Sequence, residues 1–222
     1  MSVSELIEHY RHSKEEDLSI SDLSDILELG TFLEMDCARD TAISRLSLHP
    51  DLPSVLKLSL GISFCVSQWI EPAFLHLLGL DINLLTTSDF ILLGPAVLRI
   101  LVTTQSTVSR TRLLIGLNPY KLLHQPTCNS PGPEFSLCQN KWSDAWRLGF
   151  GPHYIHPDIH LTPADALEKL STLPMKGVTP QCRAAAIQRI KESKVFEKET
   201  EIISKAVDEV RALEGTKWYR KL

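Results

Sequence analysis

Two tetrapeptides decide the fold: Ile26-Leu27-Glu28-Leu29 and, 29 residues further along the chain, Val55-Leu56-Lys57-Leu58. A second apolar motif returns in the same way, because Ala42-Ile43 is followed 31 residues later by Ala73-Phe74. An apolar pattern that repeats at this period is typical of stacked helical hairpins, each too small to bury its own face alone. We therefore predict an all-α fold of stacked helical hairpins, followed by a second, smaller helical segment.

The helices of the first block are predicted from capping residues and from apolar spacing. Ser21 is expected to cap the first helix, whose apolar residues at i, i+3 and i+4 form the predicted inner face: Leu23, Ile26, Leu27, Leu29, Phe32 and Leu33. Asp36 is expected to cap the second helix, which is expected to end at His49-Pro50 because the residue before a proline resists helical geometry. The next hairpin is predicted over residues 52–64 and 67–78.

Glycine and proline punctuate the rest of the chain. Gly94 is expected to break a short helix, and Pro95 is expected to open a long one that ends near Leu114. Residues 148–152, Leu-Gly-Phe-Gly-Pro, predict a helix stop followed by a loop. Thr162-Pro163 and Thr179-Pro180 are each expected to start a helix, with threonine as the N-cap and proline in the first helical position.

These boundaries divide the chain into four regions. We predict an N-terminal arm or capping helix over residues 1–20 and a helical-hairpin domain over 21–115. Residues 116–133, which contain four prolines, are predicted to form a linker or an ordered loop. A C-terminal helical region is expected over residues 134–222. Within it, Cys138, Trp142 and Trp146 follow each other at steps of four, which predicts one buried helical face.

Composition narrows the classes of partner. The formal net charge of -4 gives no basic field of the kind that nucleic-acid binding requires, so we expect no nucleic acid as partner. No window holds about 18 uninterrupted apolar residues, so we expect no membrane partner. The five cysteines are irregularly spaced and the N-terminus resembles no secretion signal. The chain is therefore expected to be intracellular, either cytoplasmic or nuclear.

Several motifs of the first block occur in a known order. The chain carries Ala42-Ile43, Val55-Leu56-Lys57-Leu58-Ser59, Trp69-Ile70-Glu71-Pro72-Ala73-Phe74, Leu84-Leu85-Thr86 and Leu92-Leu93-Gly94. In this order they resemble the helical region that follows the BTB/POZ domain in BTB-type proteins of basidiomycete fungi. The resemblance covers about residues 22–108, and the spacing of Cys138, Trp142 and Trp146 is similar to the variable tail of the same family. The BTB domain itself is expected upstream, where this chain has only about 20 residues.

The resemblance implies a non-catalytic protein-interaction module that acts as a scaffold or an adaptor. It further implies a protein partner, and a homodimer only if an upstream BTB domain exists. The alternatives are a zinc-stabilised helical domain and an orphan fragment of a longer BTB protein.

Cysteine and histidine are frequent in the second half of the chain. Cys128, Cys138, His153, His156 and His160 have the side chains that zinc prefers, and His124 and Cys182 are of the same residue types. A zinc site usually starts with two ligands two to four residues apart, for which His153 and His156, or His156 and His160, would serve. The competing interpretation is that Cys138 is a core residue and the histidines lie on a surface loop. From the sequence we assign no metal-binding residues and keep the zinc-stabilised domain as the alternative.

Motifs for catalysis are missing from the sequence. The chain contains no Gly-x-Ser-x-Gly, Walker or glycine-rich dinucleotide motif. We therefore assign no catalytic residues and no cofactor, and we expect the protein not to be an enzyme.

Overall fold

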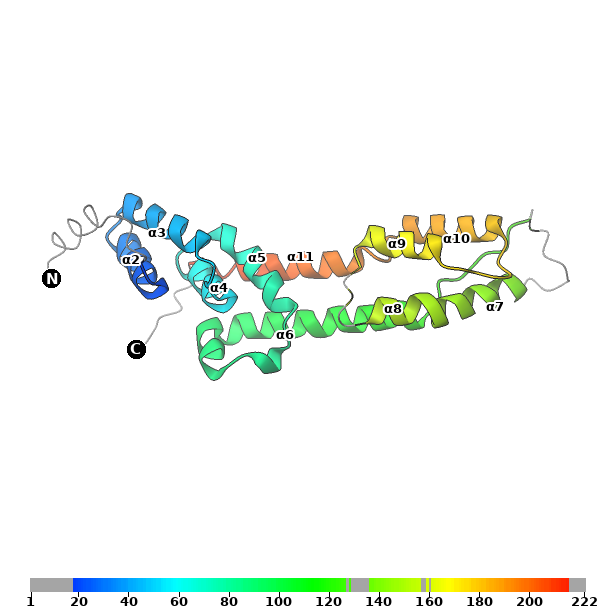
Figure 1. The fold of residues 1–222 in the computed structure, drawn as a ribbon, viewed down its shortest axis with the longest axis horizontal. Helices are drawn as coiled ribbons and strands as arrows, with labels where there is room; N and C mark the ends of the chain where they lie inside the picture. Colours follow the sequence, from blue (N-terminus) through cyan, green and yellow to red (C-terminus); the bar gives the residue numbers. More distant parts are fainter. Residues whose placement is uncertain (1–17, 127, 129–135, 157–158, 160, 216–222) are drawn as a thin grey trace. The chain divides into compact units, whose positions relative to one another are not determined.

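The computed structural model describes residues 18–126, 128, 136–156, 159 and 161–215. The prediction of an all-α fold is confirmed, and no strand occurs among these described residues. The elements, drawn in Figure 1, are α2 (Ile20–Phe32), α3 (Asp36–Leu48), α4 (Ser54–Ser63), α5 (Ser67–Leu78), the 3-10 turn η1 (Ile82–Leu84), α6 (Thr87–Leu117), α7 (Ser136–Ala145), the π-helix η2 (Trp146–Phe150), α8 (Gly151–Ile155), α9 (Pro163–Thr172), α10 (Pro180–Ser193) and α11 (Lys198–Arg211). Most of the predicted N-terminal arm lies outside the described residues.

The described chain forms two compact units. The first contains residues up to Ala96 together with the segment from Val210, and the second contains Val97–Glu209. This division differs from the predicted domain boundary at residue 115, because the chain passes from one unit to the other inside α6. The transition follows Gly94, whose φ of 71° and ψ of 165° interrupt the helical backbone as the sequence predicts.

The first unit consists of the two predicted hairpins, in which α2 packs against α3 and α4 packs against α5 (Figure 1). Trp69 of α5 is buried, and its indole N–H donates a hydrogen bond of 2.8 Å to the Ser47 hydroxyl of α3. The two hairpins therefore share one core. The residues after α11 return to this unit, since the Gly215 amide donates to the Ile62 carbonyl at 3.0 Å.

The predicted inner face of α2 is correct at one end of the helix and wrong at the other. Leu23 and Leu27 are buried, whereas Leu29, Phe32 and Leu33 are exposed. The reason is Gly30, which is buried and lies so close to α3 that an added Cβ would be only 3.0 Å from the Arg39 nitrogen. A face that runs through residues 23, 27 and 30 turns the last apolar side chains of the helix outward. The helix is also capped by Ser19 and not by Ser21, through a capping box with Asp22.

The predicted helix stop at residues 148–152 is wrong. The chain continues from α7 through the π-helix η2 into α8 without leaving helical geometry. Gly151 serves a close contact, since a Cβ on it would overlap the carbonyl oxygen of Gly116 at the end of α6. The glycines that suggest a helix end are therefore contact residues between helices.

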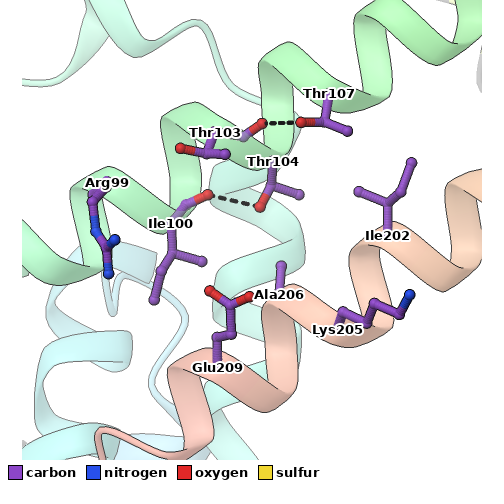
Figure 2. A pocket seen from close by; sticks show the side chains of 9 residues that line it. All are labelled: Arg99, Ile100, Thr103, Thr104, Thr107, Ile202, Lys205, Ala206 and Glu209. Carbon is purple, nitrogen blue, oxygen red and sulfur yellow. Dashed lines mark hydrogen bonds between the residues drawn. The ribbon is translucent and has the colours of Figure 1, made fainter.

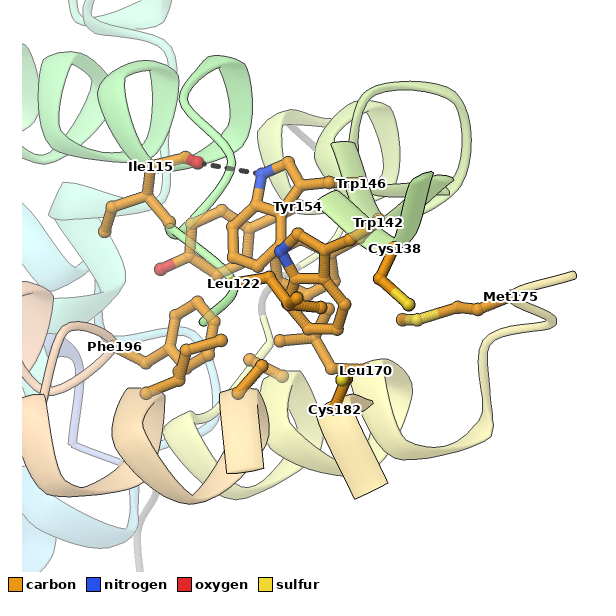
Figure 3. Close-up of a cluster of buried hydrophobic side chains, with 14 residues drawn as sticks. Ile115, Leu122, Cys138, Trp142, Trp146, Tyr154, Leu170, Met175, Cys182 and Phe196 are labelled. Atoms are coloured by element: carbon orange, nitrogen blue, oxygen red, sulfur yellow. Dashed lines mark hydrogen bonds between the residues drawn. The ribbon is translucent and has the colours of Figure 1, made fainter. Parts of the chain in front are cut away.

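The helical run from α7 to α8 supplies the aromatic core of the second unit, shown in Figure 3. Trp142, Trp146, Phe150 and Tyr154 follow each other at steps of four, with successive ring centroids 5.9, 4.6 and 5.3 Å apart. Trp142 and Trp146 are buried as the sequence predicts. Residues from α9, α10 and the segment around Phe196 complete this core.

By length and composition, α6 is the one helix among the described residues that could cross a membrane. Long core helices and signal sequences share this property, and 33% of the most apolar window of α6 is buried in the protein.

Candidate metal centre

Four side chains with metal-binding atoms converge in the second unit. One nitrogen of His124 and the sulfurs of Cys128, Cys138 and Cys182 all lie within 4.8 Å of one another. Cys138 and Cys182 are buried, whereas His124 and Cys128 are half-buried. We call these four residues the His-Cys cluster. Its two buried members lie beside the aromatic core in Figure 3.

Three separate segments of the chain bring the cluster together. His124 and Cys128 belong to the connection that follows α6, while Cys138 and Cys182 lie in the first turns of α7 and α10. The first turn of a helix carries unpaired backbone N–H groups and the positive end of the helix dipole, both of which favour a thiolate over a thiol. Two of the three sulfurs therefore lie at the N-terminal ends of helices.

Side chains of α7 hold the connection that carries His124. The Trp142 indole N–H donates a hydrogen bond of 2.8 Å to the Tyr120 carbonyl, and the Gln139 carboxamide oxygen accepts one of 2.8 Å from the Leu122 amide. Leu122 itself is buried in the aromatic core. Because Cys138 lies on the same helix, α7 positions the connection and one ligand of the cluster together.

Two of the distances within the cluster fit a tetrahedral ion. Zinc–sulfur bonds of about 2.3 Å at a tetrahedral angle place two thiolates about 3.8 Å apart, and a thiolate and an imidazole nitrogen about 3.6 Å apart. The sulfurs of Cys128 and Cys138 are 3.8 Å apart, and Cys182 Sγ is 3.8 Å from His124 Nδ1. A disulfide would require about 2.05 Å between sulfurs, so the cluster has the spacing of metal ligands and not of a disulfide.

Hydrogen bonds from neighbouring groups reach the sulfurs. The Gln125 amide N–H donates to Cys182 Sγ at 3.4 Å, and the Thr179 hydroxyl lies 3.2 Å from Cys128 Sγ. Burial raises the pKa of the Cys182 thiol, while hydrogen bonds from Thr179 and Gln125 act in the opposite direction. A coordinated cation deprotonates a thiol outright, so metal binding at this site would release protons.

The sequence pointed to only part of this cluster. The structure brings Cys128 and Cys138 together as metal-ligand candidates, but His153 on α8 and His156 at its C-terminal end are not members. His160 lies outside the described residues. Since Pro152 occupies the first turn of α8, His153 is helical and not in the predicted loop.

His124 and Cys182 are the two members whose place in the cluster the sequence analysis did not predict. His124 and Cys128 are separated by three residues, which is the close spacing that starts many zinc sites. This spacing is the local signal for the site, although both residues lie in a stretch whose prolines are typical of a linker. Cys182 has no comparable signal, since it is 44 positions from Cys138.

A second concave feature of the same unit is a groove of about 280 Å³ between α6 and α11, shown in Figure 2. The hydroxyls of Thr104 and Thr107 donate to the carbonyls of Ile100 and Thr103, four residues earlier on the same helix. Arg99, Lys205 and Glu209 contribute charges at its edges. These two hydroxyls already donate hydrogen bonds to carbonyls of α6. The groove therefore does not present a set of polar groups directed at one ligand.

Comparisons with known proteins add no relative: no family model, no curated protein and no solved structure matches the chain.

Proposed function

We propose that this chain is a non-catalytic helical protein whose second unit folds around one zinc ion, bound by His124, Cys128, Cys138 and Cys182. The observation that carries the proposal is the convergence of four ligand atoms within 4.8 Å, with two of the pairs at the spacing of a tetrahedral site. Three thiolates and one imidazole are ligands that bind zinc in tetrahedral geometry. Magnesium, calcium and manganese prefer oxygen ligands instead.

The number of ligands supports a structural ion. Catalytic zinc sites keep three protein ligands and leave one position for water or substrate, whereas structural sites are closed by four. The cluster supplies four, from segments as far apart in the chain as residues 124 and 182. An ion that joins such distant segments contributes its binding free energy to folding.

Metal analysis of the purified full-length chain tests this proposal. We expect about one equivalent of zinc in the wild type, and its loss in Cys128→Ser and in His124→Ala, since each removes one of four ligands. Cys37→Ser is the matched control, because Cys37 is exposed on α3 and is not part of the cluster. A wild-type chain that takes up no zinc after refolding with the metal would contradict the proposal.

A protein-interaction role is the second candidate, and an exposed apolar face in the first unit favours it. Leu29 and Phe32 of α2 and its C-cap Leu33 are 45%, 82% and 43% exposed, and their spacing places them on one side of the helix. Exposed apolar groups of this kind mark contact sites on soluble proteins. This role agrees with the resemblance to the helical region that follows the BTB/POZ domain.

Crosslinking in cells, followed by mass spectrometry, tests the second role. We expect Phe32→Glu to abolish the crosslinks that the wild type forms through α2. Leu48→Glu introduces the same charge at another exposed apolar residue, 84% exposed on α3, and should leave those crosslinks intact. Equal crosslinking by all three proteins would show that this face of α2 binds nothing.

A further inference from the structure

Two helices of the second unit start with the same residues, and they use their threonines differently. Thr162-Pro163 opens α9 and Thr179-Pro180 opens α10, and both threonines are N-caps with extended backbone. Their dihedral angles are similar, with φ of -67° and ψ of 161° at Thr162 and φ of -70° and ψ of 148° at Thr179. The local backbone is therefore suited to the same capping interaction in both helices.

Thr162 forms a complete capping box. Its hydroxyl accepts a hydrogen bond from the Asp165 amide at 3.2 Å, and the Asp165 carboxylate accepts from the Thr162 amide at 3.0 Å. This arrangement satisfies backbone N–H groups that have no partner inside the helix. It is the role expected of a threonine at this position.

Thr179 does not cap α10 with its side chain. Its hydroxyl lies 3.2 Å from the sulfur of Cys128 instead, and it is also a hydrogen-bond partner of the Cys182 sulfur. The residue that corresponds to Asp165 is Cys182, and its sulfur belongs to the His-Cys cluster. Thr179 and Cys182 thus occupy the two positions of a capping box, and both side chains contact the candidate metal centre instead.

The direction of the hydrogen bond follows from the chemistry of the ligand. A metal-bound cysteine is a thiolate, which has no proton to donate, so the hydroxyl must be the donor. Cys128 lies on a connection and is half-buried, whereas Cys138 and Cys182 are buried and lie on helices. A donor beside Cys128 therefore orients a thiolate ligand that does not lie on a helix.

We propose that Thr179 is the positioning residue of the metal centre: it orients and stabilises the Cys128 thiolate by donating a hydrogen bond to its sulfur. This inference rests on the proposed zinc-binding function. Removal of such an outer hydrogen-bond partner typically lowers metal affinity by about 10–100-fold. The residue does not bind the ion itself, so its loss should weaken the site without changing the set of ligands.

The test measures Zn²⁺ affinity of the full chain by competition with a chromophoric chelator, and the absorption spectrum after substitution with Co²⁺. We expect Thr179→Val to bind zinc about 10–100-fold more weakly than the wild type. Its sulfur-to-cobalt charge-transfer band should move to lower energy, because a thiolate without the hydrogen bond is a better electron donor. Thr179→Ser keeps the hydroxyl and should retain both the wild-type affinity and the wild-type spectrum.

Thr162→Val is the matched control. It removes the hydroxyl from the same Thr-Pro start of α9, so it should lower thermal stability and leave zinc affinity unchanged. Equal weakening by Thr162→Val and Thr179→Val would overturn the inference, because the effect would then come from helix capping. Should Thr179→Val not fold, as judged by its circular dichroism, the smaller Thr179→Ala replaces it in the same comparison.

The remaining outcomes separate the two proposals. A wild type that binds neither Zn²⁺ nor Co²⁺ overturns the zinc-binding function and this inference with it. A wild type that binds zinc, with Thr179→Val equal to it in affinity and spectrum, overturns the role of Thr179 alone.

Discussion

Tyr154 lies at the end of the aromatic row and is only 4% exposed. Its ring stacks on Phe150, and the ion pair between Arg112 and Glu199 acts on it electrostatically. Burial raises the pKa of the Tyr154 hydroxyl to about 12, and the carboxylate of Glu199 adds to the rise while Arg112 opposes it. The neutral phenol is therefore the form that the folded protein stabilises.

The raised pKa predicts how stability changes at alkaline pH. An unfolded tyrosine titrates near about 10, so between about 10 and 12 the folded state holds this proton more tightly than the unfolded state does. The contribution of Tyr154 to the free energy of unfolding is constant below that range and falls as the pH rises through it. The ultraviolet absorbance difference between wild type and Tyr154→Phe, titrated with base, should show a midpoint of about 12. A midpoint near 10 would mean that the hydroxyl is in contact with water.

At the scale of helices, α6 and α8 approach each other through glycines. An added Cβ on Gly151 would overlap the carbonyl oxygen of Gly116, and this backbone atom cannot move aside as a flexible side chain could. Close packing of this kind tolerates no extra methyl group.

Gly151→Ala is therefore expected to lower the free energy of unfolding by about 1–3 kcal/mol. The matched control is Gly79→Ala at the end of α5, where φ is -82° and a Cβ would have its nearest neighbour at 3.6 Å. There alanine should be neutral or stabilise by up to about 1 kcal/mol, since it restricts the unfolded chain. Urea denaturation of the two variants measures both values, and equal effects would show that α6 and α8 are less close than described.

A second connection between helices is the ion pair of Arg112 on α6 with Glu199 on α11. The guanidinium Nε lies 2.8 Å from the carboxylate in a two-pronged contact, and the two side chains are only 12% and 16% exposed. The hydrogen bond to Glu199 raises the pKa of Arg112, so the arginine stays charged.

Glu199→Gln removes the negative charge that pairs with the half-buried Arg112 guanidinium, which is expected to destabilise the protein by about 1–3 kcal/mol. Glu71→Gln breaks the corresponding pair with Arg211, whose side chains are 52% and 42% exposed, and should change stability by about 0–1 kcal/mol. Chemical denaturation of both variants gives the comparison. Similar losses in the two would show that burial does not distinguish the pairs.

At the scale of the whole molecule, the His-Cys cluster belongs entirely to the second unit. The first unit has its own core, built by the two hairpins and including Trp69. Each unit therefore has an independent source of stability, and only one of them depends on the proposed ion.

Removal of zinc should accordingly unfold or loosen one unit and not the other. With a strong chelator, we expect hydrogen exchange to accelerate in α7 and α10, which supply two of the ligands. Peptides from α3 and α5 should keep their protection, because no cluster residue lies there. Exchange measured by mass spectrometry, with and without the chelator, tests this, and equal acceleration in both units would contradict the division.

The sequence by itself determined the helical class, the two hairpins of the first unit, the break at Gly94 and the burial of Trp142 and Trp146. These features follow from periodicity and capping, which are properties of residues close together in the chain. Only the tertiary structure decided that Gly151 is a contact residue, that Phe32 faces outward and that Thr179 reaches Cys128. It also decided that Cys182 joins His124, Cys128 and Cys138 in one cluster. Such relations depend on which distant segments pack together, and no local pattern of residues contains that information.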